Sequence, residues 1–174
     1  MDPIIDLFRD HDNSTPEFTL DGIQTYARVV AIYDADSPTL VIPLENHFFK
    51  FLVRVDGIDS PEIKSSNKEA KILARRARDR MISLCTGEVV QPSNTDIAER
   101  NKKKWLKDYL KNNVCIVYVN CKEMDKYGRV IVDIRKDPDS ENFADILLKE
   151  KLVYEYHGQT KLTEEEQVAT LDVN

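Results

Sequence analysis

The chain has no apolar run long enough to cross a membrane, since no window of its 174 residues approaches the roughly 18 consecutive apolar residues that a spanning helix needs. Residues 1–6 also lack the basic region and the long apolar region of a secretion signal. We therefore expect an intracellular protein that has no membrane partner. The hydrophobic fraction of 41% is ordinary, and the length suits one domain with its own core.

Cysteine is scarce, and the positions of the cysteines argue against both disulfide bonds and a structural metal site. The three residues are Cys85, Cys115 and Cys121, an odd number without C-x-x-C spacing or a nearby histidine cluster. This argues against both a disulfide framework and a zinc site. We expect three buried thiols.

The chain also lacks the basic excess that is typical of nucleic-acid-binding proteins, because its formal net charge is −6. The charge is unevenly spread, however. Residues 64–80 hold seven Lys and Arg against two acids, and residues 100–111 hold six against Asp108 alone. A locally basic face can attract a polyanion even in an acidic protein. The same runs are typical of solvated helix faces, and both interpretations stay open.

Three polar turns stand at the ends of strand-like runs. They read D-A-D-S at 34–37, R-V-D-G-I-D-S-P-E at 54–62 and D-K-Y-G-R at 125–129. Carboxylates are hard oxygen ligands for a divalent cation, and a guanidinium group is a forked donor for a phosphate. Any one of these segments alone reads best as a solvated turn. All three together favour phosphodiester chemistry.

Together the three segments resemble the staphylococcal nuclease-like (thermonuclease) family. Its pattern is D-x-D-[ST], then R-x-x-G-[IV]-D-[STA]-P-E, then D-x-Y-G-R, and every charged position of that pattern is filled here in the same order. The resemblance covers about residues 25–160, and three linked motifs are far more specific than one. It implies an α+β fold with a mainly β core, a five-stranded OB-fold barrel with helices packed on it.

The resemblance also implies a Ca²⁺-dependent endonuclease that hydrolyses DNA, RNA or both with little sequence specificity. The cation would be held by Asp36, Asp59 and the backbone carbonyl of Ser60, with Mg²⁺ or Mn²⁺ as possible substitutes. The catalytic residues would be Arg54 and Arg129, which grip the phosphate, and Glu62, which orients or deprotonates water. The remaining implied roles are substrate binding by Lys126, Tyr154 and Tyr156 and ordering of the metal site by Asp34. Packing against the barrel is an equally good interpretation of the two tyrosines.

The periodicity of the sequence predicts the elements of this fold. Alternating apolar and β-branched residues indicate strands at 27–32, 39–44, 48–56, 114–119 and 130–134. Helical spacing indicates helices at 67–85, 95–111 and 143–149, and the capping-box spacing of Thr163 and Glu166 starts a last one. The segment at about 88–112 is longer than the family's usual link and reads as an insertion with its own helix. Within it, Trp105 and Tyr109 fit a core position better than a base-stacking one.

The N-terminal 22 residues have no clear period and form an extension to a single domain at 23–174. We expect Ile4, Ile5, Leu7 and Phe8 to tie this extension to the body.

Two other functions remain open. One is a barrel of the same family that has lost catalysis and binds nucleic acid or protein, and the other is a structural domain that presents the inserted helix to a partner. The complete set of acids and arginines favours the enzyme, because a binding-only barrel does not need all of them.

Overall fold

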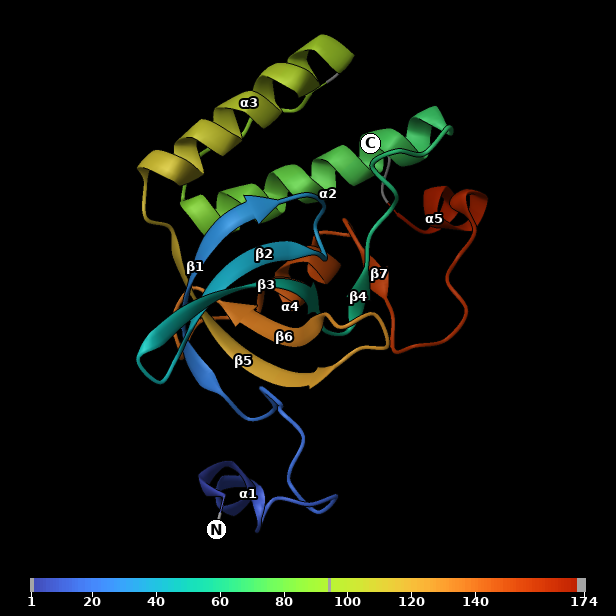
Figure 1. Ribbon diagram of the computed structural model, residues 1–174. Coiled ribbons are helices and arrows are strands. Elements are labelled where there is room, and N and C mark those ends of the chain that lie inside the picture. Colours follow the sequence, from blue (N-terminus) through green and yellow to red (C-terminus); the bar gives the residue numbers. More distant parts are fainter. Residues whose placement is uncertain (1, 94, 172–174) are drawn as a thin grey trace.

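In the computed structural model, which describes residues 2–93 and 95–171, five strands close into a barrel (Figure 1). Their order around it is β1-β2-β3-β6-β5, with β5 returning to β1. Only the β3–β6 pair is parallel. The prediction of an α+β, OB-fold-like barrel with packed helices is confirmed. The strands are β1 Gln24–Ile32, β2 Pro38–Leu44, β3 His47–Val55, β5 Ile116–Met124 and β6 Val130–Arg135.

The barrel interior is filled by alternate residues of each strand, which is why the period-2 pattern located all five strands. Buried and less buried positions alternate along β2, β5 and β6. The fully enclosed side chains are mostly aliphatic, which suits a small barrel without a lumen. Eight of them are Val29, Leu40, Ile42, Val53, Val117, Val119, Val132 and Ile134.

A second, two-stranded sheet lies beside the barrel and was not expected from the sequence. It pairs β4, Ile58–Asp59, with β7, Tyr154–Glu155, in antiparallel register. Asp59 therefore stands directly opposite Tyr154, and the amide of Tyr156 donates to the carbonyl of Gly57 over 2.9 Å. This pairing brings the C-terminal part of the chain onto the turn that follows β3.

Local sequence signals set the ends of the helices. Helix α2, Lys68–Thr86, begins after Asn67, whose side chain accepts from the amides of Glu69 and Ala70, and it ends at Gly87 in the left-handed conformation (φ 80°). Helix α4 spans Phe143–Lys149, and α5 spans Glu164–Thr170. The capping box predicted at the start of α5 is confirmed, since Thr163 and Glu166 bond each other's backbone amides.

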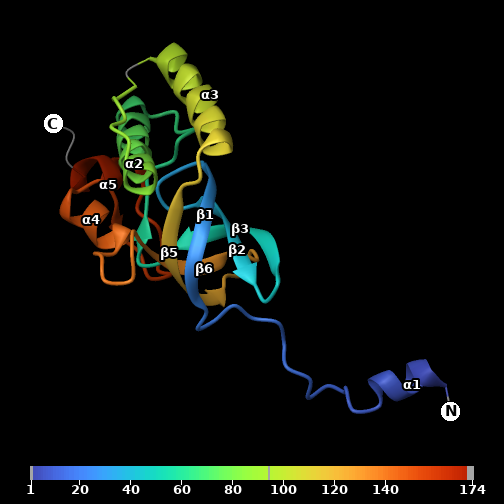
Figure 2. The ribbon, with the colours of Figure 1, turned by 90° about the vertical axis from the view of Figure 1, so that its left-hand side faces the viewer.

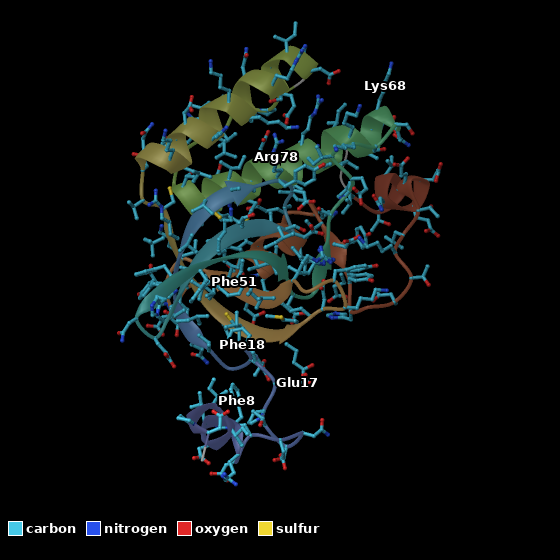
Figure 3. All side chains as sticks on the ribbon, in the orientation of Figure 1. Phe8, Glu17, Phe18, Phe51, Lys68 and Arg78 are labelled. Atoms are coloured by element: carbon cyan, nitrogen blue, oxygen red, sulfur yellow. The ribbon has the colours of Figure 1, made fainter. Side chains whose placement is uncertain are left out.

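The inserted segment forms helix α3, Asp96–Asn112, which lies over α2 as an outer layer (Figures 1 and 2). Charged side chains buried between the two helices hold it there. Arg78, labelled in Figure 3, is only 2% exposed and forms a bidentate pair with Glu99, one contact being 2.8 Å from Nη2 to Oε2. Lys102 pairs with the buried Asp79. Because the guanidinium fork matches both carboxylate oxygens, this pairing sets the register of α3 on α2.

The expectation that Trp105 belongs to the core is wrong. Leu106 and Leu110 are buried on the inner side of α3, but Trp105 is 39% exposed. Its ring packs against Tyr109 with the centroids 5.3 Å apart, and the Tyr109 hydroxyl donates to Glu88 over 2.9 Å. The aromatic pair covers the link between α2 and α3, because the angle at which α3 is docked turns this side away from the barrel.

The expectation that Ile4, Ile5, Leu7 and Phe8 anchor the N-terminal extension is also wrong. They lie on a short helix, α1 Pro3–Phe8, and their side chains are 62–69% exposed. Figures 2 and 3 show α1, with Phe8, set apart from the barrel at the end of an extended arm. Contact with the body begins at Leu20, which is fully buried. The apolar character of these four residues did not predict whether they pack on the domain, because the extended arm holds them apart from the barrel.

The three thiols are free and buried, as predicted for Cys85, Cys115 and Cys121. Burial raises the pKa of Cys85 to about 12 and that of Cys121 to about 11. Both therefore stay protonated at neutral pH and are poor nucleophiles. Among the described residues, no helix is both long and apolar enough to cross a membrane.

The buried pair between α2 and α3 predicts a large stability effect. Replacing Glu99 with alanine leaves the buried Arg78 guanidinium with only its longer contact to Asp79 at 3.3 Å, so Glu99→Ala should lower the free energy of unfolding by about 3–5 kcal/mol. Urea denaturation measures this change. The matched control is Glu150→Ala, which breaks the Arg80–Glu150 pair at 2.7 Å, where both side chains are 38% exposed, and should cost less than about 1 kcal/mol. Equal losses in the two variants would show that the buried pair does not hold α3.

Candidate active site

The site is organised around Arg54, whose buried guanidinium group bridges two carboxylates. Arg54 lies near the end of β3, and its Nη1 contacts Asp36 Oδ2. Its Nη2 donates to Asp59 Oδ1 and to the carbonyl of Ile58, both over 2.8 Å. The turn after β1, the end of β3 and strand β4 are therefore joined through one side chain.

Asp36 is held as an acceptor by its neighbours. Its Oδ2 accepts from the amide of Ser60 over 3.1 Å, and its Oδ1 accepts from the Ser37 hydroxyl over 3.0 Å. Burial pushes the pKa of Asp36 up, but the positive charge of Arg54 and the hydrogen bonds to neighbouring side chains together outweigh burial and hold the pKa below its usual value. Asp36 is therefore an ionised carboxylate at neutral pH.

Asp59 is buried, and its hydrogen-bond partners come from the C-terminal part of the chain. The Tyr154 hydroxyl donates to its Oδ2, and Lys161 Nζ lies 2.9 Å from its Oδ1. Burial raises the pKa of Asp59, and the bonds from Lys161 and Tyr154 oppose that rise. Burial and the neighbouring Asp59 charge together also raise the pKa of the Tyr154 hydroxyl, so it is a donor at all working pH values.

Asp34 is the one acid of this group with an unsatisfied oxygen. Its Oδ1 is buried and has no hydrogen-bond partner among the described residues. Burial, followed by the negative charge of Asp36, raises the pKa of Asp34 to about 7. Asp34 and Asp36 therefore differ in proton affinity although they lie two residues apart, because only Asp36 is paired with a guanidinium group.

Beside the carboxylates lies an open pocket of about 530 Å³. Arg54 and Arg129 both line it, so two guanidinium groups from distant parts of the chain meet at one hollow. Arg129 keeps its orientation through a contact of 2.7 Å from its Nε to Asp125 Oδ2. The wall also includes the exposed Lys126 and the aromatic rings of Tyr127, Tyr156 and His157. The acids Asp56 and Asp125 also line the pocket, so its wall combines three cationic side chains with two acids and three aromatic rings.

The two predicted substrate-binding tyrosines have different surroundings. Tyr154 is buried and bonded to Asp59, whereas the half-buried Tyr156 lines the pocket. The Tyr156 ring centroid is 5.5 Å from Arg54 Cζ and 5.8 Å from Lys161 Nζ, within the range of a cation–π contact. Only Tyr156 therefore offers a face to a ligand in the pocket.

The predicted site residues do not all lie at the pocket. Asp34, Asp36, Asp59 and Ser60 form the carboxylate cluster behind Arg54, and Ser60 contributes its amide to that cluster. Glu62 lies on the exposed turn after β4 and is not part of the pocket lining, although its charge contributes to the raised pKa of Asp34. Of the predicted residues, the two arginines and Lys126 therefore line the pocket, and the acids of the carboxylate cluster lie beside it.

Sequence reasoning missed Lys161 and His157. Both follow β7, and neither falls in a motif or a periodic segment, so only the pairing of β7 with β4 places them near Asp59 and the pocket. Asp125 was inside the third motif, and its role as the acceptor that orients Arg129 was readable only from the structure.

The donor set at the predicted metal site is made of oxygen atoms only. Within residues 2–93 and 95–171, no group of three or more His, Cys, Asp and Glu side chains is arranged to hold a metal ion. The predicted set contains two carboxylates, Asp36 and Asp59, together with a backbone carbonyl. The unsatisfied Oδ1 of Asp34 adds a further buried oxygen beside them. Such a set suits a hard divalent cation and not a soft one.

No protein-family model matches the chain, and no curated protein matches it either. The functional argument therefore depends on the chemistry and the positions of these residues.

The contact between Tyr154 and Asp59 predicts different effects for the two tyrosines. Tyr154→Phe removes a donor from a buried carboxylate and should lower the free energy of unfolding by about 1.5–3 kcal/mol. Tyr156→Phe is the matched control, because the Tyr156 hydroxyl makes no hydrogen bond within the described residues, and its stability should stay close to that of the wild type. Thermal melts of both variants test this. A Tyr154→Phe protein as stable as Tyr156→Phe would remove Tyr154 from its assigned role.

Proposed function

We propose that this chain is a metal-dependent nuclease of the staphylococcal nuclease-like type, which hydrolyses phosphodiester bonds of DNA, RNA or both. The observation that carries the proposal is the meeting of Arg54 and Arg129 at one pocket, while Arg54 also bridges Asp36 and Asp59. This places donors for a phosphate next to oxygen ligands for a cation. Phosphoryl-transfer sites need both, since their catalysis is mainly positioning and charge stabilisation.

For the cation we propose Ca²⁺, held by Asp36, Asp59 and the carbonyl of Ser60, with Mg²⁺ and Mn²⁺ as the alternatives to be tested. The all-oxygen donor set and the unsatisfied Asp34 Oδ1 support this choice. When bound, the cation supplies positive charge at a phosphate oxygen and at the attacking water. Asp34 lies beside Asp36 and would orient that carboxylate.

The two arginines would bind the phosphate and stabilise the charge that grows on its oxygens. Both remain protonated at any working pH, and the fork of each offers paired N–H donors. One donor aimed at such developing charge is typically worth about 3–4 kcal/mol. Arg129 is held by Asp125 through its Nε, so its terminal nitrogens are available to a phosphate. Both terminal nitrogens of Arg54 contact Asp36 and Asp59, so Arg54 would exchange part of these contacts for the phosphate as the two acids turn to the cation.

Glu62 would take the proton from the attacking water or orient that water. It is exposed on the turn after β4, where solvent water can reach its carboxylate. Lys126 and Tyr156 would contact the flanking nucleotides, through a phosphate and through a ring face respectively. No element of the pocket offers a pattern of base-reading groups, so sequence specificity should be weak.

Arg129 gives the cleaner test of the two arginines, because Arg54 also holds buried acids and its removal would disturb the fold. Arg129→Ala should lower kcat by about 10²–10³-fold, with the melting temperature nearly unchanged. The control is Arg80→Ala, which also removes an arginine from an ion pair but lies on α2 away from the pocket. Near-normal turnover in Arg129→Ala would contradict the assignment.

Glu62→Gln separates chemistry from cation binding. The amide keeps the shape of the side chain but cannot accept a proton, so turnover should fall by about 10²–10⁴-fold. Calcium affinity, measured by isothermal titration calorimetry, should stay close to that of the wild type. Glu123→Gln, an exposed glutamate on β5, is the control. A variant that loses calcium affinity instead of turnover would make Glu62 a ligand.

The function itself is tested by incubating labelled single- and double-stranded DNA and RNA with the protein in Ca²⁺, Mg²⁺, Mn²⁺ or chelator. Cleavage with a divalent cation and none with chelator is the expected result. Cleavage in excess chelator would refute the metal dependence. Tight binding without cleavage under every condition would favour a catalytically inactive module instead.

A further inference from the structure

Helix α3 carries a row of basic side chains along one exposed side, away from the Arg54–Arg129 pocket. Two members of the row, Lys103 and Lys107, border a groove between α3 and β1. At 3.6 residues per turn, the side chains of the row fall within an arc of about 100°, and the row is about 16 Å long. All of them are exposed. We call this row the α3 basic stripe, and its members are Arg100, Lys103, Lys104, Lys107 and Lys111.

The orientation of the stripe is set by the buried side of α3 that adjoins it. Leu106 and Leu110 are buried there, and Glu99 is paired with the buried Arg78 of α2. At the C-terminal end, Arg28 of β1 donates to the carbonyl of Leu110 over 3.1 Å. These contacts fix α3 on α2 and β1, and so they also fix the direction in which the stripe faces.

The stripe costs stability within the chain. Its members stand three or four residues apart, and each such like-charged pair destabilises a helix by about 0.2–0.5 kcal/mol. Between Arg100 and Lys111 the acid next to the arc is Asp108, which stands four residues after Lys104 and three before Lys111 and so offsets part of this repulsion. Asp96, one turn earlier, is bound by Arg75 at 2.5 Å, and Lys103 reaches Glu99 only at 3.8 Å. A helix side that is merely solvated usually alternates its charges, so this arrangement indicates an external anion.

We propose that the α3 basic stripe binds the phosphate backbone of double-stranded nucleic acid, as a second contact separate from the pocket. A duplex carries one negative charge per about 1.7 Å of its axis, so a straight row of about 16 Å meets several phosphates at once. The stripe has no aromatic member for stacking on unpaired bases, since Trp105 and Tyr109 pack on each other over the α2–α3 link. Backbone contacts alone carry no sequence information.

This inference rests on the proposed function in one respect: the duplex held by α3 is the substrate that the pocket would cut. Binding by the stripe needs no catalysis, so it is measured in chelator. The test variant is Lys104→Gln with Lys107→Gln and Lys111→Gln. The matched control carries the same charge change at three exposed lysines elsewhere, Lys50→Gln with Lys68→Gln and Lys149→Gln.

The experiment is fluorescence anisotropy of a labelled 30-base-pair duplex over a range of salt concentrations. The stripe variant should bind at least about tenfold more weakly than the wild type at 0.1 M salt, and its plot of log K against log salt should be shallower by about 2–3, or roughly 0.9 for each lost contact. The control should keep the wild-type slope. Equal slopes in the two variants would overturn the proposal.

Two further measurements separate this proposal from the proposed function and from a folding effect. The stripe variant should melt close to the wild type, because the relief of like-charge repulsion offsets the loss of the Lys104–Asp108 and Asp108–Lys111 pairs and of the Lys111 charge in the last turn of α3. It should also cleave a dinucleotide, which reaches only the pocket, at the wild-type rate. Loss of the cooperative melting transition or of dinucleotide cleavage would overturn a role confined to binding. If the wild type cleaves nothing but the slopes differ as expected, the proposed function fails and the stripe is still a duplex-binding surface.

Discussion

The interaction on which this structure most depends is the bridge from Arg54 to Asp36 and Asp59. It joins the turn after β1, the end of β3 and strand β4 through one buried guanidinium group. Three buried charges are tolerable only because each is paired, and the removal of one would leave the others uncompensated. The residues proposed for chemistry therefore also hold the open end of the barrel together.

A second constraint is the short β4–β7 pairing, which closes the site from the C-terminal side. It sets Tyr154 opposite Asp59 and brings Lys161 within 2.9 Å of the same carboxylate. It also turns Tyr156 toward the pocket that Arg54 and Arg129 share. In a chain with a net charge of −6, Arg54, Lys126 and Arg129 meet at this pocket, and the local field there depends on the groups that line it more than on the overall charge.

The inserted helix α3 contributes to a different part of the molecule. It is docked on α2 by buried ion pairs, lies outside the barrel and adds no residue to the pocket lining. The two proposals therefore concern different parts of the fold. We propose phosphodiester chemistry at the pocket beside Arg54 and contact with a duplex backbone at α3.

The sequence by itself determined the barrel strands, helix α2 and the charged groups of the three turns, because these depend on local periodicity, caps and motif spacing. Only the tertiary structure decided which of those groups meet. Ile4 and Trp105 are exposed because of where the tertiary structure places the N-terminal arm and α3. The hydropathy of a residue depends on its type and carries no information about that position. The different surroundings of Tyr154 and Tyr156 and the contact of Lys161 with Asp59 arise from strand pairing across about 100 residues. Contacts of that range leave no local pattern, since each side chain alone looks like an ordinary surface residue.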